Sequence, residues 1–181
     1  MNFKQYQTTL YSINNVSAQL VHGRALSRLN SFFVTFGRPL SGANAETTDS
    51  KEINCFYLSP NGQNITLRCM AGEKSFPDNA ISNLSEFWHR LLGTVGVLHS
   101  GSHCVSITKS SYASDQHIQG IDTEKVPGQS HGSGLNTHAA SLTLDLRNLG
   151  STSADWPSNC FLTTWSEAML EITADGVSVA T

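Results

Sequence analysis

The residues whose types and spacing most resemble a catalytic motif are Gly128-Gln129-Ser130-His131-Gly132, which match the GxSxG pattern of a serine nucleophile. In α/β-hydrolases this pattern works because a strand ends in a sharp turn that runs directly into a helix. Here Pro127 precedes the pattern and Gly132-Ser133-Gly134 continues it, so we do not expect a helix to begin there. The chain also lacks the alternating strands and helices of that fold. The pattern therefore does not predict a hydrolase.

Seven histidines offer imidazoles for metal binding or acid–base chemistry. His99 and His103 are four residues apart, but Ser100-Gly101-Ser102 between them is typical of a turn rather than a helix. We therefore expect histidines that face solvent or lie in loops. No paired carboxylates lie in an apolar setting, and no phosphate-binding or dinucleotide-binding glycine motif is present. The sequence predicts no enzyme, no catalytic or metal-binding residue and no cofactor.

The chain has four cysteines, and each lies in or beside an apolar segment. This setting favours reduced thiols in the core, because a free cysteine behaves there as a small apolar residue. Disulfides remain an alternative, and so does a metal site, although no CxxC or HxxC spacing supports one. The four residues are Cys55, Cys69, Cys104 and Cys160.

The composition favours a globular β-rich domain over several other classes of protein. The chain has 181 residues, the size of one domain, with 39% hydrophobic residues and a net charge of −3. A disordered chain would be less apolar and more charged, and a coiled coil would be richer in charged residues. Because no basic run is present, we expect no direct binding to nucleic acid. No segment is long and apolar enough to span a membrane, and the N-terminus does not resemble a secretory signal.

Short apolar and β-branched segments, separated by Gly, Pro, Asn, Asp and Ser clusters, predict strands along the whole chain. The clearest case is Leu142, Leu144 and Leu146, which alternate with polar residues and predict one buried and one exposed face. Ala174-Asp175-Gly176 predicts a tight hairpin turn between the last two strands. The predicted strands cover residues 5–11, 16–21, 28–36, 53–58, 64–70, 103–109, 141–149, 160–164, 169–173 and 177–180.

One segment has the pattern of an amphipathic helix. Asn83 and Glu86 have the spacing of a capping box, and Gly93 and Gly96 provide a C-terminal stop. Apolar residues recur between them at helical intervals. We expect this helix to lie across a sheet and to pack through Leu84, Phe87, Trp88 and Leu91.

Two stretches, residues 37–52 and 120–138, have neither strand nor helix periodicity and predict long loops. The fold class expected is all-β, a jelly-roll β-sandwich of two antiparallel sheets with one inserted amphipathic helix and long loops. The whole chain, residues 1–181, forms a single jelly-roll domain in this prediction. The residues expected on inward faces of the strands are Phe33, Leu142, Leu144, Leu170 and Ile172.

Several segments, taken in order, resemble the C-terminal jelly roll of double jelly-roll, hexon-like major capsid proteins of polinton-type, adintovirus-like and virophage-like DNA viruses. The first is a strand in which a basic residue leads into an aromatic run, Ser27-Arg28-Leu29-Asn30-Ser31-Phe32-Phe33-Val34-Thr35-Phe36, and the second is Phe76-Pro77 followed by a helix over 86–92. The third is Gly120-Ile121-Asp122-Thr123-Glu124-Lys125, which leads to Ser133-Gly134-Leu135-Asn136-Thr137. The last is Leu170-Glu171-Ile172 followed by Asp175-Gly176-Val177-Ser178-Val179.

The resemblance implies a viral structural protein whose jelly roll forms trimeric, pseudo-hexagonal capsomers of an icosahedral shell. The expected partners are copies of the chain itself, as a homotrimer, and neighbouring capsid proteins, and the expected location is the virion, assembled in the host cell. A double jelly-roll protein is more than twice this length. The chain is therefore the C-terminal half of a longer polypeptide or a single jelly-roll relative.

The long glycine-rich loop is the candidate intersubunit segment. Its glycines permit unusual backbone conformations, and its few apolar residues favour contact with a neighbouring jelly roll or subunit over a solvated linker. The candidate residues are Gly120, Val126, Pro127, Gly132, Gly134 and Leu135. A jelly-roll module that binds carbohydrate or protein is the alternative function.

Overall fold

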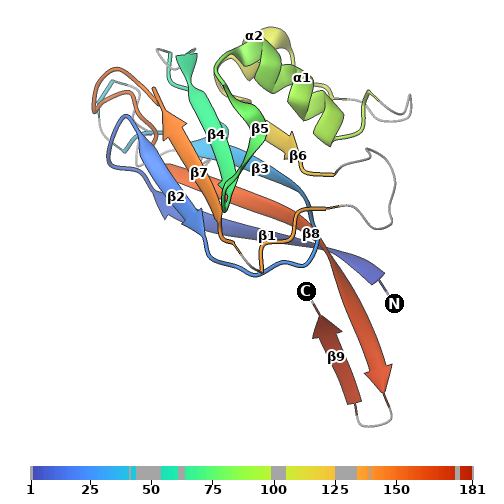
Figure 1. Cartoon of the computed structure of the whole chain (residues 1–181). Coiled ribbons are helices and arrows are strands. Elements are labelled where there is room, and N and C mark those ends of the chain that lie inside the picture. The colour runs from blue at the N-terminus through green and yellow to red at the C-terminus, as the bar shows by residue number, and fades with distance from the viewer. Residues whose placement is uncertain are drawn as a thin grey trace.

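The structure is a computed structural model that describes residues 2–40, 42–43, 54–60, 64–98, 105–124, 134–138, 140–173 and 176–180. At residues 2–3, 169–173 and 176–180 it describes the backbone. Figure 1 shows facing sheets, with the helices at one end and a hairpin that extends from the other. In chain order the elements are β1 (Asn2–Ser12), β2 (Ala18–His22), β3 (Leu29–Gly37), β4 (Thr66–Ala71), β5 (Lys74–Ile81), α1 (Leu84–Thr94), α2 (Lys109–Tyr112), β6 (Gln119–Asp122), β7 (Leu142–Arg147), β8 (Asn159–Thr173) and β9 (Gly176–Ala180).

The strands pair in a nested order that defines the topology. β1 pairs with β8, β2 with β7, β3 with β6 and β4 with β5, and all of these pairs are antiparallel. The chain is therefore arranged like one long hairpin that has been rolled into two sheets, which is the jelly-roll arrangement. One sheet has the order β1-β8-β3-β6, with β9 paired to β8, and the other has the order β2-β7-β4-β5. The predicted all-β jelly-roll sandwich is confirmed.

The core lies between the inner faces of the two sheets. Leu142, Leu144 and Leu146 of β7 are completely buried, as predicted. The prediction for Phe33 is wrong, because Phe32 takes the inward position and Phe33 lies half-buried on the opposite face of β3. Neighbouring residues of a strand face opposite sides of the sheet, so from the sequence either of the two adjacent phenylalanines could face inward. The pairing register decides which one enters the core. The predicted burial of Leu170 and Ile172 lies outside the described side chains.

Several predicted strands differ from the structure. Residues 160–164 and 169–173 belong to one long strand, β8, because β1 pairs with it continuously from Asn159 to Met169. The described part of 53–58 forms no strand, and its backbone instead makes scattered hydrogen bonds, among them Tyr57 N donating to Phe36 O at the end of β3. Residues 105–108 also form no strand, and Lys109 begins the short helix α2, which was not predicted. The sequence prediction also missed β5, which contains Pro77.

The predicted helix is confirmed as α1, with the expected cap. The Asn83 side chain accepts a hydrogen bond from the backbone N–H of Glu86 at 2.7 Å. The Glu86 carboxylate does not complete a reciprocal capping box but accepts two bonds from the Arg90 guanidinium, one turn further on. Phe87 and Leu91 are buried, and Leu84 and Trp88 are partly buried against the core.

We expect the replacement Phe87→Ala to lower the free energy of unfolding by about 3–5 kcal/mol, because the ring is completely buried and the shortened side chain leaves a cavity. Urea titration followed by circular dichroism measures the loss. The matched control is His89→Ala, on the exposed side of the same helix, which should change stability by less than about 0.5 kcal/mol. A loss below about 1 kcal/mol for the Phe87 variant would contradict the packing described for α1.

Candidate functional site

The structure separates Gly120 from the loop in which the sequence analysis placed it. Gly120 lies inside β6, opposite Phe33 of β3, and is buried. A β-carbon at this position would lie 3.1 Å from Leu91 Cδ1 and 3.2 Å from Thr94 Cβ, both on α1. Glycine fits here because the side chains of α1 approach the strand closely, and a β-carbon would push these two side chains back by a few tenths of an ångström. The short, glycine-containing strand β6 gave no clear periodicity in the sequence.

The first end of the candidate loop is fastened to its own domain. Glu124, the last described residue before the loop, accepts a hydrogen bond from the Asn30 side chain, and burial raises the pKa of the Glu124 carboxyl. The Thr123 hydroxyl donates to the Asn30 carbonyl oxygen at 2.8 Å. The loop therefore leaves the sheet from a fixed position beside the start of β3.

The second end is fastened to the same segment of chain. Leu135 pairs with Leu29 through two backbone hydrogen bonds of 2.8 and 2.9 Å, and its side chain packs partly against the core. Gly134 has φ +146°, a conformation that favours glycine. The Thr137 hydroxyl accepts from Leu26 N at 2.8 Å. Val126, Pro127, Gly132 and the GxSxG residues 128–132 lie outside the described residues, so the interface role of this loop stays a prediction.

We expected histidines that face solvent or lie in loops, and among the four described histidines only His22, which is buried in β2, differs from this expectation. His117 is buried but lies in the connection between α2 and β6. His89 and His138 are exposed, whereas His22 and His117 are buried. His99, His103 and His131 lie outside the described residues. Within the described part of the chain, no group of three or more His, Cys, Asp or Glu residues is arranged to hold a metal ion.

His117 lies in a small buried cluster between α1, α2 and β6. Its Nδ1 lies 3.3 Å from the Tyr112 carbonyl oxygen, and its Nε2 lies 3.0 Å from the Gln119 side-chain nitrogen. The neutral tautomer that fits both contacts donates from Nδ1 and accepts at Nε2. The rings of Phe87 and Tyr112 pack around it, at centroid distances of 6.0 and 4.8 Å. Burial lowers the pKa of His117 to about 4, so the ring is neutral at physiological pH.

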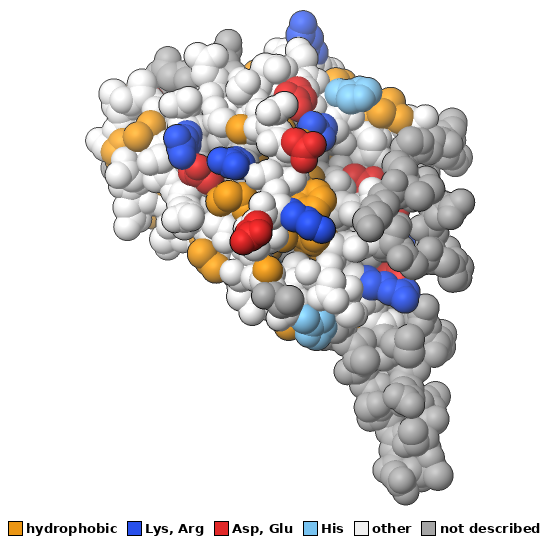
Figure 2. Space-filling model, viewed as in Figure 1, with side chains coloured by type: hydrophobic (Ala, Val, Ile, Leu, Met, Phe, Trp, Pro, Cys, Tyr) orange, Lys and Arg blue, Asp and Glu red, His pale blue; other side chains and the backbone are white. Residues whose placement is uncertain are grey.

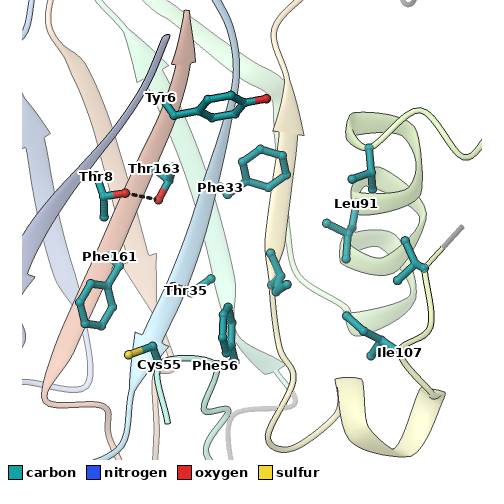
Figure 3. A pocket seen from close by; sticks show the side chains of 13 residues that line it. Tyr6, Thr8, Phe33, Thr35, Cys55, Phe56, Leu91, Ile107, Phe161 and Thr163 are labelled. Atoms are coloured by element: carbon teal, nitrogen blue, oxygen red, sulfur yellow. Dashed lines mark hydrogen bonds between the residues drawn. The ribbon is translucent and has the colours of Figure 1, made fainter. Parts of the chain in front are cut away.

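An apolar groove of about 470 Å³ runs along the outer face of the five-stranded sheet. Its floor consists of outward-facing side chains of β3 and β8, including Phe33 and Phe161, and the Thr8 and Thr163 hydroxyls bond at 2.9 Å along it (Figure 3). Leu91 of α1 and Val95, the residue that follows this helix, form part of one wall, as the close view shows for Leu91. All thirteen residues that line the groove are uncharged.

The rim of the groove carries exposed apolar side chains. Tyr6 is 63% exposed, and Phe56 and Val95 are 43% and 40% exposed. The Tyr6 ring stacks on Trp165 at a centroid distance of 5.9 Å, and the Lys4 ammonium lies 4.5 Å from the Trp165 ring centroid. This cluster is the strongest interaction surface among the described residues, because solvent-exposed apolar patches mark binding faces. The sequence analysis missed it, although the outward-facing Phe33 and Phe161 are its signal.

The described cysteines agree with the prediction of reduced core thiols. Cys69 and Cys160 are completely buried and form no disulfide. Burial raises the pKa of each thiol to about 12, which keeps both protonated and unreactive. Cys55 differs from them, because it is half-buried and lines the groove. Cys104 lies outside the described residues.

Comparison with known proteins identifies the fold. No family model matches the sequence, and no curated protein is similar to it. Among solved structures, the chain is similar to PBCV-1 VP54, as a crystal structure fitted into a cryo-EM reconstruction of the virophage Sputnik. The identity is 10%, the TM-score is 0.60, and the match covers 100% of this chain and 51% of that chain. The two share a fold. The chain therefore spans about half the length of the solved structure that it matches.

The buried histidine predicts how stability depends on pH. The unfolded state takes up a proton near pH 6.5, whereas folded His117 resists protonation down to about pH 4. Its contribution is therefore complete above about pH 6.5 and is lost as the pH falls toward 4. Between pH 7 and pH 4, the free energy of unfolding should fall by on the order of 2–3 kcal/mol more in the wild type than in His117→Gln.

Urea titrations of both proteins at each pH measure this difference. Taking the difference between them removes the contributions of His22 and Glu124, because both groups are present in the two proteins. Equal pH dependence in the wild type and the variant would show that the His117 ring is accessible to solvent.

Proposed function

We propose that this chain is a capsid jelly roll, a structural protein that assembles with copies of itself into the shell of a virus. The observation that carries the proposal is the nested pairing of eight strands in two sheets, together with the likeness in fold to VP54 that covers the whole chain. The VP54 crystal structure has been fitted into a reconstruction of a virophage. Fold likeness together with the resemblance of the sequence segments to double jelly-roll capsid proteins favours the same class of function.

The proposed assembly unit is a trimer. Each of its three parts consists of two jelly rolls, so the six jelly rolls together give the unit a pseudo-hexagonal shape. The match to only 51% of the VP54 chain supports a second jelly roll beside this one. It is supplied by the rest of a longer polypeptide or by another copy of this chain. Copies of such units would tile an icosahedral shell, and the protein would be located in the virion after assembly in the host cell.

The surface charge supports a protein–protein role rather than binding to nucleic acid. On the face shown in Figure 2, basic and acidic side chains are interspersed among polar and apolar ones. Several charges are also neutralised in pairs, such as Arg38 with Asp115 at 2.7 Å and Arg90 with Glu86 at 2.8 Å. Nucleic-acid binding requires a basic patch or stripe, which neither the sequence nor this face provides. Neither helix in the described part of the chain has the length and hydrophobicity to cross a membrane.

A carbohydrate-binding jelly roll is the second candidate, and one observation favours it. The stacked rings of Tyr6 and Trp165 lie on the outer face of a sheet, and such aromatic platforms can pack against sugar rings. The Lys4 ammonium over Trp165 competes with a sugar for the same ring face. Titration with soluble oligosaccharides, followed by tryptophan fluorescence, tests this candidate, and Trp165→Ala provides its control.

The capsid proposal predicts self-association into a defined oligomer. Sedimentation velocity of the purified chain should reveal trimers that grow into larger shells. We expect the same of a longer polypeptide that contains this chain. Negative-stain electron microscopy should show three-fold particles of pseudo-hexagonal outline. A protein that stays monomeric at all accessible concentrations and binds an oligosaccharide would support the second candidate instead.

The candidate loop predicts a separation between folding and assembly. Deletion of Gln129 to Gly134 should impair trimer or shell formation, while circular dichroism and thermal unfolding remain close to those of the intact chain. Ser130→Ala is the matched control and should change neither assembly nor any hydrolytic activity, since we assign no nucleophile there. Normal assembly of the deletion variant would refute the interface role of the loop.

A further inference from the structure

The C-terminal hairpin extends past the body of the sandwich. β1 pairs with β8 as far as Met169, and beyond that point β8 pairs with β9 alone among the described strands. Figure 1 shows this two-stranded ribbon pointing away from both sheets and from the helices. A two-stranded ribbon is at best marginally stable in water unless an apolar face is covered. A partner surface that covers one face of the ribbon would therefore stabilise it.

The pairing register gives the ribbon one apolar face. Leu170 is opposite Val179, and Ile172 is opposite Val177. Directly opposed residues share a face, and so do residues two apart along a strand, so these four positions lie together. They continue the same side of β8 that buries Cys160 and Leu162 in the core.

The groove on the outer sheet face matches this ribbon in polarity and charge. Every residue that lines the groove is uncharged, and so are the four residues of the apolar ribbon face. Glu171 alternates with Leu170 and Ile172 along β8, so its position lies on the opposite face of the ribbon. A ribbon that enters the groove through its apolar face would therefore bury no charge there.

A hairpin cannot reach the groove of its own chain. Thr163 lies on the groove floor, and Ile172 follows nine residues later on the same strand. At about 3.3 Å per residue, the two positions lie roughly 30 Å apart. The ribbon can therefore occupy this groove only on another copy of the chain.

We propose that the β8–β9 hairpin of one copy docks, through Leu170, Ile172, Val177 and Val179, in the outer-sheet groove of a second copy. This contact joins two different surfaces, so it is heterologous and can close into a ring such as a trimer. It rests on the proposed function in that it names the surface through which the shell subunits associate. Tyr6, Phe33 and Phe56 contribute the receiving face.

A cross-linking experiment tests the contact directly. Cys55 lines the groove, so a second cysteine in the hairpin, Val177→Cys, should be joined to Cys55 of another copy by a short bismaleimide. Cys104→Ser in all proteins removes the thiol whose position is not described, and Cys69 and Cys160 are buried. We expect covalent oligomers on reducing gels, and we expect their loss when Cys55 is replaced by Ser.

The matched control moves the introduced cysteine to Val21→Cys, on the other sheet at a position that is 53% exposed. It should yield no oligomers that depend on Cys55. Equal yields from the Val177 and Val21 variants, or oligomers that persist without Cys55, would overturn the docking proposal.

A second measurement separates this inference from the proposed function. Ile172→Lys should weaken self-association at least ten-fold in sedimentation equilibrium, whereas Val21→Lys should leave it unchanged. Circular dichroism checks that both variants remain folded. Trimers that form normally in Ile172→Lys overturn the hairpin contact but leave the shell function standing. A wild-type chain that never self-associates overturns both.

Discussion

The burial of two sheet faces against each other is the interaction on which the rest of this structure depends. Leu142, Leu144 and Leu146 of β7 meet the inward residues of β3 and β8, and burial of such side chains contributes about 1.5–3 kcal/mol each. Because the strands pair in nested order, each sheet combines strands that are far apart in the sequence. Neither sheet can bury its apolar face until the whole chain has been rolled up, so the core and the topology form together.

Both faces of the five-stranded sheet carry apolar side chains, such as Phe32 on the inner face and Phe33 on the outer face. Its inner face is covered by the second sheet, and α1 covers only the part of its outer face near β6. Gly120 makes that cover possible by letting Leu91 and Thr94 approach the strand. The uncovered remainder is the groove, where Tyr6 and Phe56 stay exposed to solvent. An incompletely covered sheet is the physical reason why this domain has a surface suited to association.

The proposed assembly of many identical domains would require that they do not repel one another. The net charge of −3 is small for 181 residues, and several of the charged side chains are paired on the surface. The loop between Glu124 and Gly134 leaves and rejoins the domain at neighbouring points on the 24–30 segment. A loop fastened at both ends can form contacts with a neighbour without disturbing the core beneath it.

The sequence by itself determined the elements with strong local signals. Alternation fixed β7, the Asn83 cap and apolar spacing fixed α1, and the Asp175-Gly176 turn fixed the last hairpin, because each signal acts within a few residues. The tertiary structure alone decided that Phe32 and not Phe33 enters the core, that residues 159–173 form one strand, and that Gly120 belongs to a sheet. It also brought β1, β3, β8 and α1 together around the groove. These features depend on pairing between strands that are far apart in the sequence. The register of such a pairing cannot be read from the hydrophobic periodicity of any single segment.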